Sequence, residues 1–286
     1  MQLNSRVAIV TGAGGGLGRS HALYLARHGA KVLINDLDQA VADKVAAEIK
    51  AAGGEAIGFG ASVTDEARVA AMVEKAMSAW GRVDILINNA GILRDKSFSK
   101  MSMDDFRLVV DIHLMGAVVP TKAVWEIMRT QNYGRIVMTT SSTGLFGNFG
   151  QTNYGAAKMA LVGFMQTLAI EGQKNNVRVN CLAPTAATQM TQSIMPPEML
   201  AKLAPERVSP GLLLLVGEDA PTRAILNAGA GHFARTNVAL TRGVRIGGGE
   251  DAGEQVIARW DEISDRKDET VPAGGFGQTQ QELAPD

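Results

Sequence analysis

Three side chains in the middle of the chain have the types and the spacing that proton transfer needs. Tyr154 and Lys158 are four residues apart, so on a helix they share one face and the ammonium can lie near the phenol. A free phenol has a pKa of about 10, too high for efficient proton transfer at neutral pH, and a nearby positive charge lowers it. Ser141 could hydrogen-bond a substrate oxygen. The three together fit carbonyl–alcohol interconversion by hydride transfer, although a Tyr-x-x-x-Lys pair alone is frequent by chance.

A glycine-rich segment near the N-terminus offers a place for a dinucleotide. Its pattern is Thr-Gly-x-x-x-Gly-x-Gly, with Gly12, Gly16 and Gly18 in the glycine places and Leu17 between the last two. Glycine lets the chain turn tightly and brings backbone N–H groups close to a phosphate at a helix N-terminus. The alternative is a glycine-rich turn that binds nothing, which the strand–turn–helix context disfavours.

An acidic residue follows at the distance expected for ribose recognition. Asp36 lies eighteen residues beyond Gly18, at the end of the next apolar run. A carboxylate there accepts hydrogen bonds from the adenosine ribose hydroxyls and repels a 2′-phosphate, so the preferred cofactor is NAD rather than NADP. Taken alone, Asp36 could equally be the N-cap of the following helix.

These residues sit among short β-rich runs that alternate with longer amphipathic ones. The predicted strands are Val7–Val10, Lys31–Asn35, Val83–Asn88, Arg135–Thr139 and Val177–Leu182, and the predicted helices are Leu17–His28, Asp38–Ala52 and Asp65–Trp80. The alternation implies right-handed crossovers and one parallel sheet covered on both faces. The fold class is therefore α/β, a single-domain doubly wound sheet of the Rossmann type.

The regular alternation fades after about residue 190. We expect residues 1–250 to form the catalytic domain, with a proline-broken lid near 190–209, and residues 251–286 to be a partly flexible C-terminal extension. The run from Gly274 to Gln281 is expected to be a loose tail.

Composition excludes several classes of protein. The 286 residues include 28 basic and 29 acidic side chains, and a net charge of -1 argues against a nucleic-acid binder. The single cysteine, Cys181, cannot form an internal disulfide, and the four histidines are scattered, so no metal site is expected. No apolar run approaches the roughly 20 residues of a membrane span, and no signal peptide is recognised. We expect a protein without a membrane span, in the cytoplasm.

Thr11–Gly18, Asn88–Gly91 and the Ser141, Tyr154 and Lys158 trio together resemble the short-chain dehydrogenase/reductase family, over about residues 5–250. Within it, Asn35–Leu37, Gly91–Phe98 and Gly134–Lys158 resemble the (3R)-hydroxyacyl-CoA dehydrogenases. That subgroup includes the dehydrogenase unit of peroxisomal multifunctional enzymes of type two and bacterial relatives that act on fatty acyl or steroid side-chain CoA esters.

The resemblance implies a role for each matching residue. Tyr154 would be the general acid/base, Lys158 would lower its pKa and hold the nicotinamide ribose, and Ser141 would polarise the substrate oxygen. The positions implied for cofactor binding are Gly12, Gly16, Leu17, Gly18, Asp36, Ser62, Val63, Asn89, Gly91, Tyr154, Lys158 and Thr188.

The chain departs from the family pattern at three places. Ser62 stands where an acidic residue is more usual, and Pro184-Thr185 replaces the usual Pro-Gly before Thr188. His113 occupies the place of the asparagine that completes the family's catalytic set, a trait shared with the hydroxyacyl-CoA subgroup. We include His113 among the catalytic candidates, and favour a structural histidine over a catalytic imidazole.

The expected activity is NAD-dependent interconversion of a (3R)-3-hydroxyacyl-CoA and its 3-keto form in β-oxidation. Alternatives are a hydroxysteroid dehydrogenase acting on a ring alcohol, and a 3-ketoacyl carrier-protein reductase, which Asp36 disfavours because such enzymes usually use NADPH. A non-catalytic NAD sensor is disfavoured by the intact trio. The substrate would be a small molecule, an acyl-CoA or steroid. The resemblance also implies a homodimer or homotetramer, packed through the apolar helix that runs from Tyr154 to about Gly172.

Overall fold

The computed structural model of the chain describes residues 2–187 and 196–284. The chain divides into two compact units, Met1–Arg235 and Thr236–Asp286. The first contains the whole sheet apart from the last residue of its edge strand, together with most of the helices, so it positions every predicted site residue that the structure describes.

The first unit is built on one eight-stranded sheet in the order β3-β2-β1-β4-β5-β6-β7-β8. Its strands are β1 Val7–Val10, β2 Lys31–Asp36, β3 Ala56–Gly60, β4 Ile85–Asn88, β5 Gly134–Thr139, β6 Val177–Thr185, β7 Ile225–Gly229 and β8 His232–Thr236. Strands β1 to β7 pair in parallel. The two residues between β7 and β8, Ala230 and Gly231, have φ of 51° and 80°, which suits the tight turn of an antiparallel hairpin.

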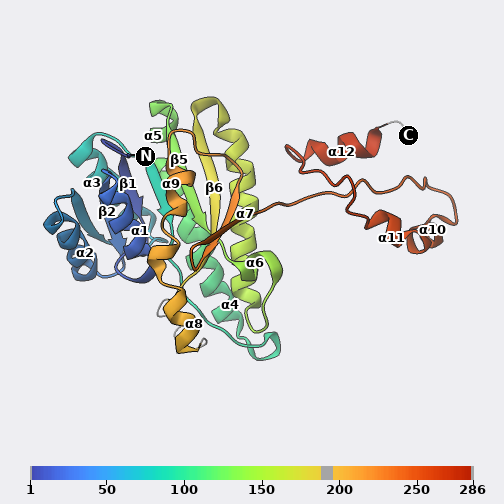
Figure 1. Cartoon of the computed structure of the whole chain (residues 1–286), viewed down its shortest axis with the longest axis horizontal. Coiled ribbons are helices and arrows are strands. Elements are labelled where there is room, and N and C mark those ends of the chain that lie inside the picture. The colour runs from blue at the N-terminus through green and yellow to red at the C-terminus, as the bar shows by residue number, and fades with distance from the viewer. Residues whose placement is uncertain (1, 188–195, 285–286) are drawn as a thin grey trace. The chain divides into compact units, whose positions relative to one another are not determined.

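Helices cover both faces of the sheet (Figure 1). In the first unit they are α1 Gly16–Arg27, α2 Gln39–Ala51, α3 Glu66–Trp80, α4 Met103–Val110, α5 Gly116–Gln131, α6 Ser142–Phe146, α7 Thr152–Glu171, α8 Pro197–Lys202 and α9 Gly211–Val216. The predicted doubly wound α/β fold is confirmed, and the predicted helices are correct to within one residue at each end.

Alternation along the strands divides the buried side chains between two cores. Ala8 and Val10 face the core beneath α1, α2 and α9, whereas Val7 and Ile9 face the core beneath α3, α5 and α7. A parallel strand buried on both faces therefore consists entirely of apolar residues, which is why β1 could be recognised in the sequence.

Three of the eight strands were missed, namely β3, β7 and β8. β3, Ala56–Gly60, contains two glycines, which lower its strand propensity and hide it. The structure explains both, because a Cβ at Gly58 or Gly60 would collide with the backbone of α2 at Asp43 or Gln39. The glycines allow α2 to lie close against the edge strand.

The apolar helical stretch Met103–Gln131 is, among the described residues, one candidate for a membrane span by length and composition, with a mean hydropathy of 1.4. Charged residues interrupt this stretch, so it is not a continuous apolar run of about 20 residues. The segment comprises α4, a π-helical turn and α5, and Val109, Val124 and Met128 on it are fully buried. We interpret it as a core helix that the sheet covers.

The second unit contains α10 Ala252–Ala258, α11 Trp260–Ile263 and α12 Phe276–Leu283, with one antiparallel bridge between Leu240 and Thr270. The loose tail expected from Gly274 to Gln281 is wrong, because α12 begins at Phe276. Gly274 and Gly275 precede this helix, and Gln, Glu and Leu within it favour helix formation.

Candidate active site

A cleft of about 590 Å³ lies at the carboxyl ends of β1, β2, β4, β5 and β6. The order of winding reverses between the adjacent strands β1 and β4, which is where an open α/β sheet forms a ligand crevice. The structure brings thirteen of the fourteen predicted site residues into its walls: Gly12, Gly16, Leu17, Gly18, Asp36, Ser62, Val63, Asn89, Gly91, His113, Ser141, Tyr154 and Lys158.

The fourteenth, Thr188, lies outside the described residues, as do Met190 and Met195 of the predicted lid. The end of β6, Pro184–Thr185, lines the cleft immediately before them. Helix α8 and the turn at Pro205 fall within the range of the predicted lid, which stays a prediction.

The glycine loop presents backbone to the cleft. Gly12 has a φ of +60°, and a Cβ there would lie 2.7 Å from the Cα of Ala90. Helix α1 begins at Gly16 with Gly15 as a side-chain-free N-cap and no acidic residue in its first turn. Its first N–H groups have no side-chain cap, so a phosphate can accept hydrogen bonds from them.

Asn89 fixes the shape of this loop. Its Nδ2 donates to the carbonyl oxygens of Thr11 and Gly12 at 3.0 and 3.1 Å, and its backbone N–H donates to Thr11 Oγ1 at 3.0 Å. The Asn89 side chain therefore joins the end of β4 to the turn after β1 and stabilises the conformation of the glycine loop.

Asp36 ends β2 and lines the cleft. Its carboxylate accepts hydrogen bonds from the N–H groups of Gly14 at 2.9 Å and Leu37 at 2.8 Å. The N-cap of α2 is Asp38, whose side chain accepts from the N–H of Ala40 at 2.8 Å. The alternative reading of Asp36 as a helix N-cap is therefore wrong, because the helix begins two residues too late for it.

The structure brings Ser141, Tyr154 and Lys158 together. Ser141 follows β5 as the N-cap of α6, where its Oγ accepts from the N–H of Thr143 at 3.2 Å. Tyr154 and Lys158 lie on one face of α7, with Lys158 Nζ 5.5 Å from the centre of the tyrosine ring.

Burial controls the protonation of this trio. It raises the pKa of Tyr154, a change that a hydrogen bond with Ser141 opposes and the charge of Asp95 reinforces. Burial also lowers the pKa of Lys158 to about 7. Its ammonium donates to the carbonyl oxygen of Thr139 at 2.6 Å. Burial of the phenol dominates in the chain by itself, and the lowering of the Tyr154 pKa by Lys158 stays a prediction.

His113 is buried on a single π-helical turn, Asp111–Met115, a distortion frequent at functional sites. Its Nε2 lies 2.7 Å from the carbonyl oxygen of Ile92, and its ring packs edge-on against Tyr154 with 5.1 Å between ring centres. Nδ1 is buried and has no hydrogen-bond partner among the residues that the structure describes. Burial lowers the pKa of His113 to about 3, helped by the charge of Lys158, so the imidazole is neutral at physiological pH.

Sequence reasoning missed a polar group in the same cleft. Asn148 and Gln151 line it beside Ser141, and Gln151 is hydrogen-bonded to Asp95 at 2.7 Å. Both amides lie between the predicted catalytic serine and tyrosine, a position that could have indicated contact with the substrate.

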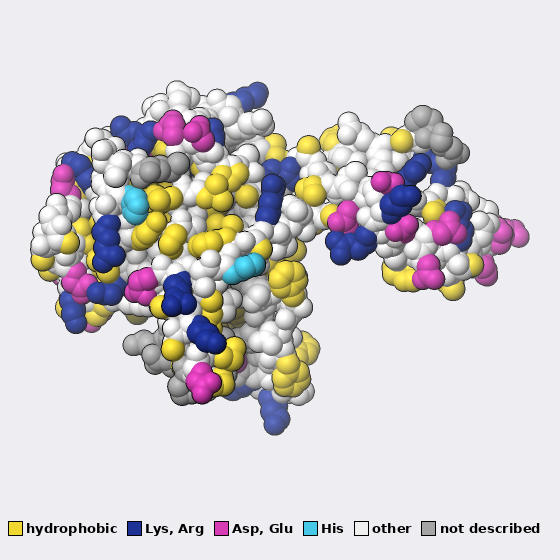
Figure 2. Space-filling model, in the orientation of Figure 1, with side chains coloured by type: hydrophobic (Ala, Val, Ile, Leu, Met, Phe, Trp, Pro, Cys, Tyr) yellow, Lys and Arg dark blue, Asp and Glu magenta, His cyan; other side chains and the backbone are white. Residues whose placement is uncertain are grey.

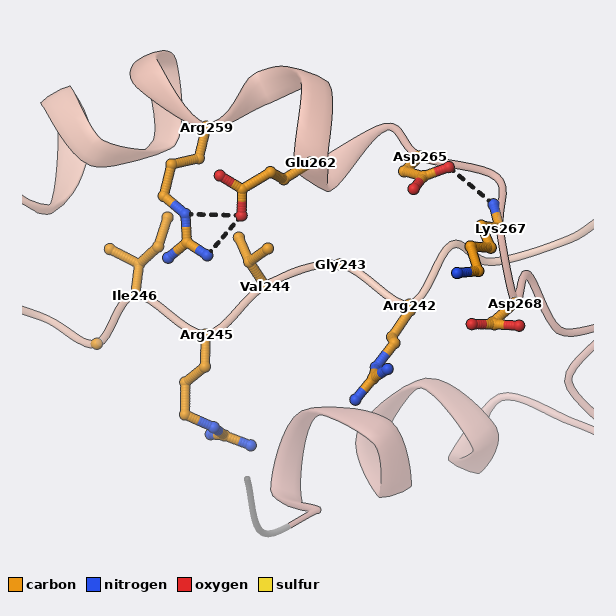
Figure 3. Close-up of a pocket in the computed structure, with 11 residues that line it drawn as sticks. Arg242, Gly243, Val244, Arg245, Ile246, Arg259, Glu262, Asp265, Lys267 and Asp268 are labelled. Atoms are coloured by element: carbon orange, nitrogen blue, oxygen red, sulfur yellow. Dashed lines mark hydrogen bonds and ion pairs between the residues drawn. The ribbon is translucent and has the colours of Figure 1, made fainter.

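A larger cavity of about 770 Å³ lies within the second unit. Figure 3 shows its lining of charged side chains of both signs, including the ion pair between Arg259 and Glu262. None of the predicted site residues lines it. The smaller cleft is the better candidate because it contains the groups that can perform chemistry.

On the face seen in Figure 2, basic and acidic side chains intermix over the first unit. Within residues 2–187 and 196–284, no three His, Cys, Asp or Glu side chains cluster as a metal ion would require.

The family model described as short chain dehydrogenase matches residues 6–198. The chain belongs to the short-chain dehydrogenase/reductase family. Peroxisomal multifunctional enzyme type 2 of Drosophila melanogaster is 47% identical over 252 residues, which cover 85% of this chain and 42% of the fly enzyme. The structure of that full-length enzyme matches with a TM-score of 0.84 and 37% identity, over 99% of this chain and 49% of the other.

Two further proteins are similar over most of their length. A short-chain type dehydrogenase/reductase of Mycobacterium tuberculosis is 45% identical over 273 residues, 92% of this chain and 95% of its own. The structure of a 7α-hydroxysteroid dehydrogenase with NADH and a 7-oxo bile acid matches with a TM-score of 0.74 and 30% identity, over 80% of this chain and 95% of the other. This chain thus spans less than half of the fly multifunctional enzyme and nearly all of the mycobacterial protein.

Proposed function

We propose that this short-chain oxidoreductase converts a (3R)-3-hydroxyacyl-CoA to the 3-ketoacyl-CoA with NAD, in the degradation of fatty acyl or steroid side chains. The observation that carries the proposal is one cleft that contains Ser141, Tyr154 and Lys158 near β5 and Asp36 at the end of β2. Strands β1 and β4 lie between β2 and β5, so about 14 Å separates the two groups at roughly 4.8 Å per strand. That span suits an extended dinucleotide.

The residues present fit NAD. The uncapped N-terminus of α1 would hold the diphosphate, Asp36 would accept from the adenosine ribose hydroxyls, and Lys158 would hold the nicotinamide ribose. Asp36 supports NAD over NADP because its carboxylate would repel a 2′-phosphate.

In this mechanism Tyr154 accepts the substrate hydroxyl proton and Ser141 holds the same oxygen. When bound, NAD supplies the hydride acceptor at nicotinamide C4 and a positive charge in the cleft. Lys158 stabilises the Tyr154 phenolate only while the lysine amine carries its proton. The pKa of Lys158 is lowered to about 7, so in the chain alone this stabilisation operates at neutral or lower pH. Ser141 Oγ accepts from the N–H of Thr143, so its own hydroxyl hydrogen can donate to Tyr154 or to the substrate oxygen.

A hydroxysteroid dehydrogenase acting on a ring alcohol is the second candidate, supported by the likeness to the solved 7α-hydroxysteroid dehydrogenase. A 3-ketoacyl carrier-protein reductase is less favoured, since Asp36 would disfavour NADPH.

The test mixes the protein with NAD or NADP and each enantiomer of a 3-hydroxyacyl-CoA, with a free steroid alcohol in parallel, and follows absorbance of the reduced nicotinamide. We expect turnover of the (3R) thioester with NAD. Turnover of the (3S) form alone would contradict the stereochemistry, and turnover of the steroid alcohol alone would establish the second candidate.

We also propose a homodimer or homotetramer in the cytoplasm. Helix α7 is rich in apolar residues, several of them buried, and leaves Met159 and Ile170 exposed at 42% and 47%. Covering them against a second copy would remove apolar surface from water. Light scattering on the eluted peak of a gel-filtration column measures the assembly.

A further inference from the structure

The amide of Gln151 lies in the wall of the cleft and is almost fully buried, with 8% of the residue exposed. It is the residue before α7, three positions ahead of Tyr154. Its Oε1 accepts hydrogen bonds from Thr143 Oγ1 and Asn148 Nδ2, both at 2.9 Å. Its Nε2 donates to Asp95 Oδ2 at 2.7 Å.

These contacts fix which way the amide faces. A carboxylate only accepts hydrogen bonds, so the Asp95 side holds the nitrogen of Gln151, and both lone pairs of the amide oxygen are already used. The nitrogen carries a second hydrogen, which has no partner among the residues that the structure describes. A buried donor oriented in this way is costly to leave unpaired.

The loop that carries Asp95 is held against the start of α7. Asn153 Nδ2 donates to the carbonyl oxygen of Arg94 at 3.1 Å, and the N–H of Lys96 donates to the carbonyl oxygen of Gly150 at 2.9 Å. Asp95 therefore contacts Gln151 from a fixed backbone rather than from a free loop.

Gln151 is also connected to the serine that would hold the reacting oxygen. Thr143 donates its N–H to Ser141 Oγ at 3.2 Å and its hydroxyl to Gln151 Oε1. One residue thus joins two hydrogen-bonding groups that face the same cleft. A 3-hydroxyacyl thioester has two oxygens that could pair with these two groups, the C3 hydroxyl with Ser141 and the C1 carbonyl with Gln151. An isolated ring alcohol has only one such oxygen.

We propose that the second N–H of Gln151 donates to the C1 thioester carbonyl oxygen of the substrate, and that Asp95 is the positioning residue that orients this amide. The inference rests on the proposed function, which supplies the acyl thioester. It makes Gln151 the residue that selects a β-oxygenated acyl thioester over a simple secondary alcohol.

The test compares (3R)-3-hydroxybutyryl-CoA with S-(3-hydroxybutyl)-CoA of the same configuration, in which a CH₂ group replaces the C1 carbonyl. For each substrate, kcat/KM of Gln151→Leu is divided by that of the wild type, so the different intrinsic reactivity of the two alcohols cancels. We expect a loss of roughly 10- to 100-fold on the thioester, because one oriented donor is removed, and a change within about twofold on the thioether.

Asp95→Asn should also lower kcat/KM on the thioester, by a smaller factor than Gln151→Leu. Asp104→Asn, which removes a carboxylate that is 97% exposed, is the matched control and should leave kcat/KM unchanged for both substrates. NAD affinity measured by fluorescence titration should stay within about twofold in all three variants, which separates a substrate effect from misfolding.

Equal losses on thioester and thioether in Gln151→Leu, or no loss on either, would overturn the role of Gln151 and leave the proposed function intact. Failure of the wild type to oxidise the thioester while it oxidises other secondary alcohols would overturn both.

Discussion

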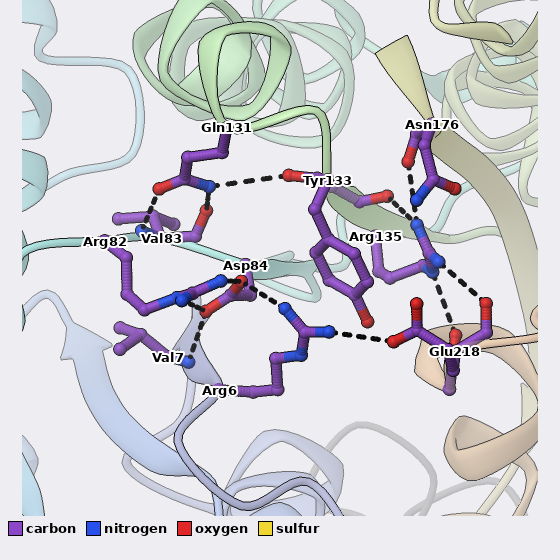
Figure 4. A network of polar contacts seen from close by, with 12 residues as sticks. Arg6, Val7, Arg82, Val83, Asp84, Gln131, Tyr133, Arg135, Asn176 and Glu218 are labelled. Atoms are coloured by element: carbon purple, nitrogen blue, oxygen red, sulfur yellow. Dashed lines mark hydrogen bonds and ion pairs between the residues drawn. The ribbon is translucent and has the colours of Figure 1, made fainter.

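The central sheet buries polar groups in opposite ways at the two ends of its strands, called here the amino-terminal edge, where the strands begin, and the carboxyl-terminal edge, where they end. At the amino-terminal edge, the buried carboxylate of Asp84 accepts from the N–H of Val7 at 2.9 Å, from Arg6 at 3.1 Å and from Arg82 at 2.7 Å (Figure 4). A buried charge is tolerated when partners of opposite charge and hydrogen bonds surround it.

The guanidinium of Arg135 completes this edge. Although fully buried, it donates at 2.8–2.9 Å to the carbonyl oxygens of Gly134, Asn176, Gly217 and Glu218. It also lies 4.0 Å from the ring centre of Tyr133, and Arg6 lies 3.6 Å from the same ring. Segments that are distant in the sequence are joined here.

The carboxyl-terminal edge leaves polar atoms without partners. Asn88 Oδ1 and Thr139 Oγ1, at the ends of β4 and β5, and Nδ1 of His113 are buried and make no hydrogen bond within the described chain. The comparison teaches that one edge is completed by the chain itself, whereas the other retains unmet hydrogen-bonding capacity where a ligand would bind.

Replacing Tyr154 by Phe should give the largest effect, a loss of activity that arises at the carboxyl-terminal edge alone. Loss of the phenolic hydroxyl removes the proposed proton acceptor, so kcat should fall by about 10³-fold or more. NAD affinity, measured by fluorescence titration, should be nearly unchanged because the ring remains. Full activity in this variant would contradict the mechanism.

Replacing Asp84 by Asn should affect the amino-terminal edge alone. Arg82 loses its charged partner and Arg6 keeps only Glu218, and because both arginines are partly exposed the free energy of unfolding should fall by about 2–3 kcal/mol. Urea denaturation measures it. The Michaelis parameters of the folded enzyme should be unchanged.

Glu126→Gln provides the matched control for Asp84, since it removes one carboxylate of an exposed ion pair with Arg129 and should have almost no effect on stability. A large change in kcat with Asp84→Asn would show that the two edges are coupled and would remove the contrast drawn between them.

A smaller effect is expected from pH. His113 and His21 are buried, and burial lowers the pKa of each to about 3. Below about pH 6.5 the unfolded chain binds more protons than the folded chain, so stability should fall as the pH drops from about 6.5 toward 3. His113→Asn should flatten the fall in melting temperature between pH 7 and 5 by several degrees. An unchanged slope would contradict the neutral, buried histidine.

Much of the fold could be predicted because local pattern and tertiary environment agree. Val7–Val10 is apolar throughout because both faces of β1 are covered, and Asp65 precedes α3 as its N-cap. β3 could not be predicted, because Gly58 and Gly60 are required by the close approach of α2 rather than by the strand itself.

The sequence by itself determined the α/β fold class, the glycine loop and the identity of the trio, because each depends on residue type at a short, fixed spacing. Tertiary structure decided the protonation of Tyr154 and Lys158, because burial, which no spacing reveals, governs both pKa values. It also decided the contact of Gln151 with Asp95, because α7 and the loop after β4 meet only in the folded chain.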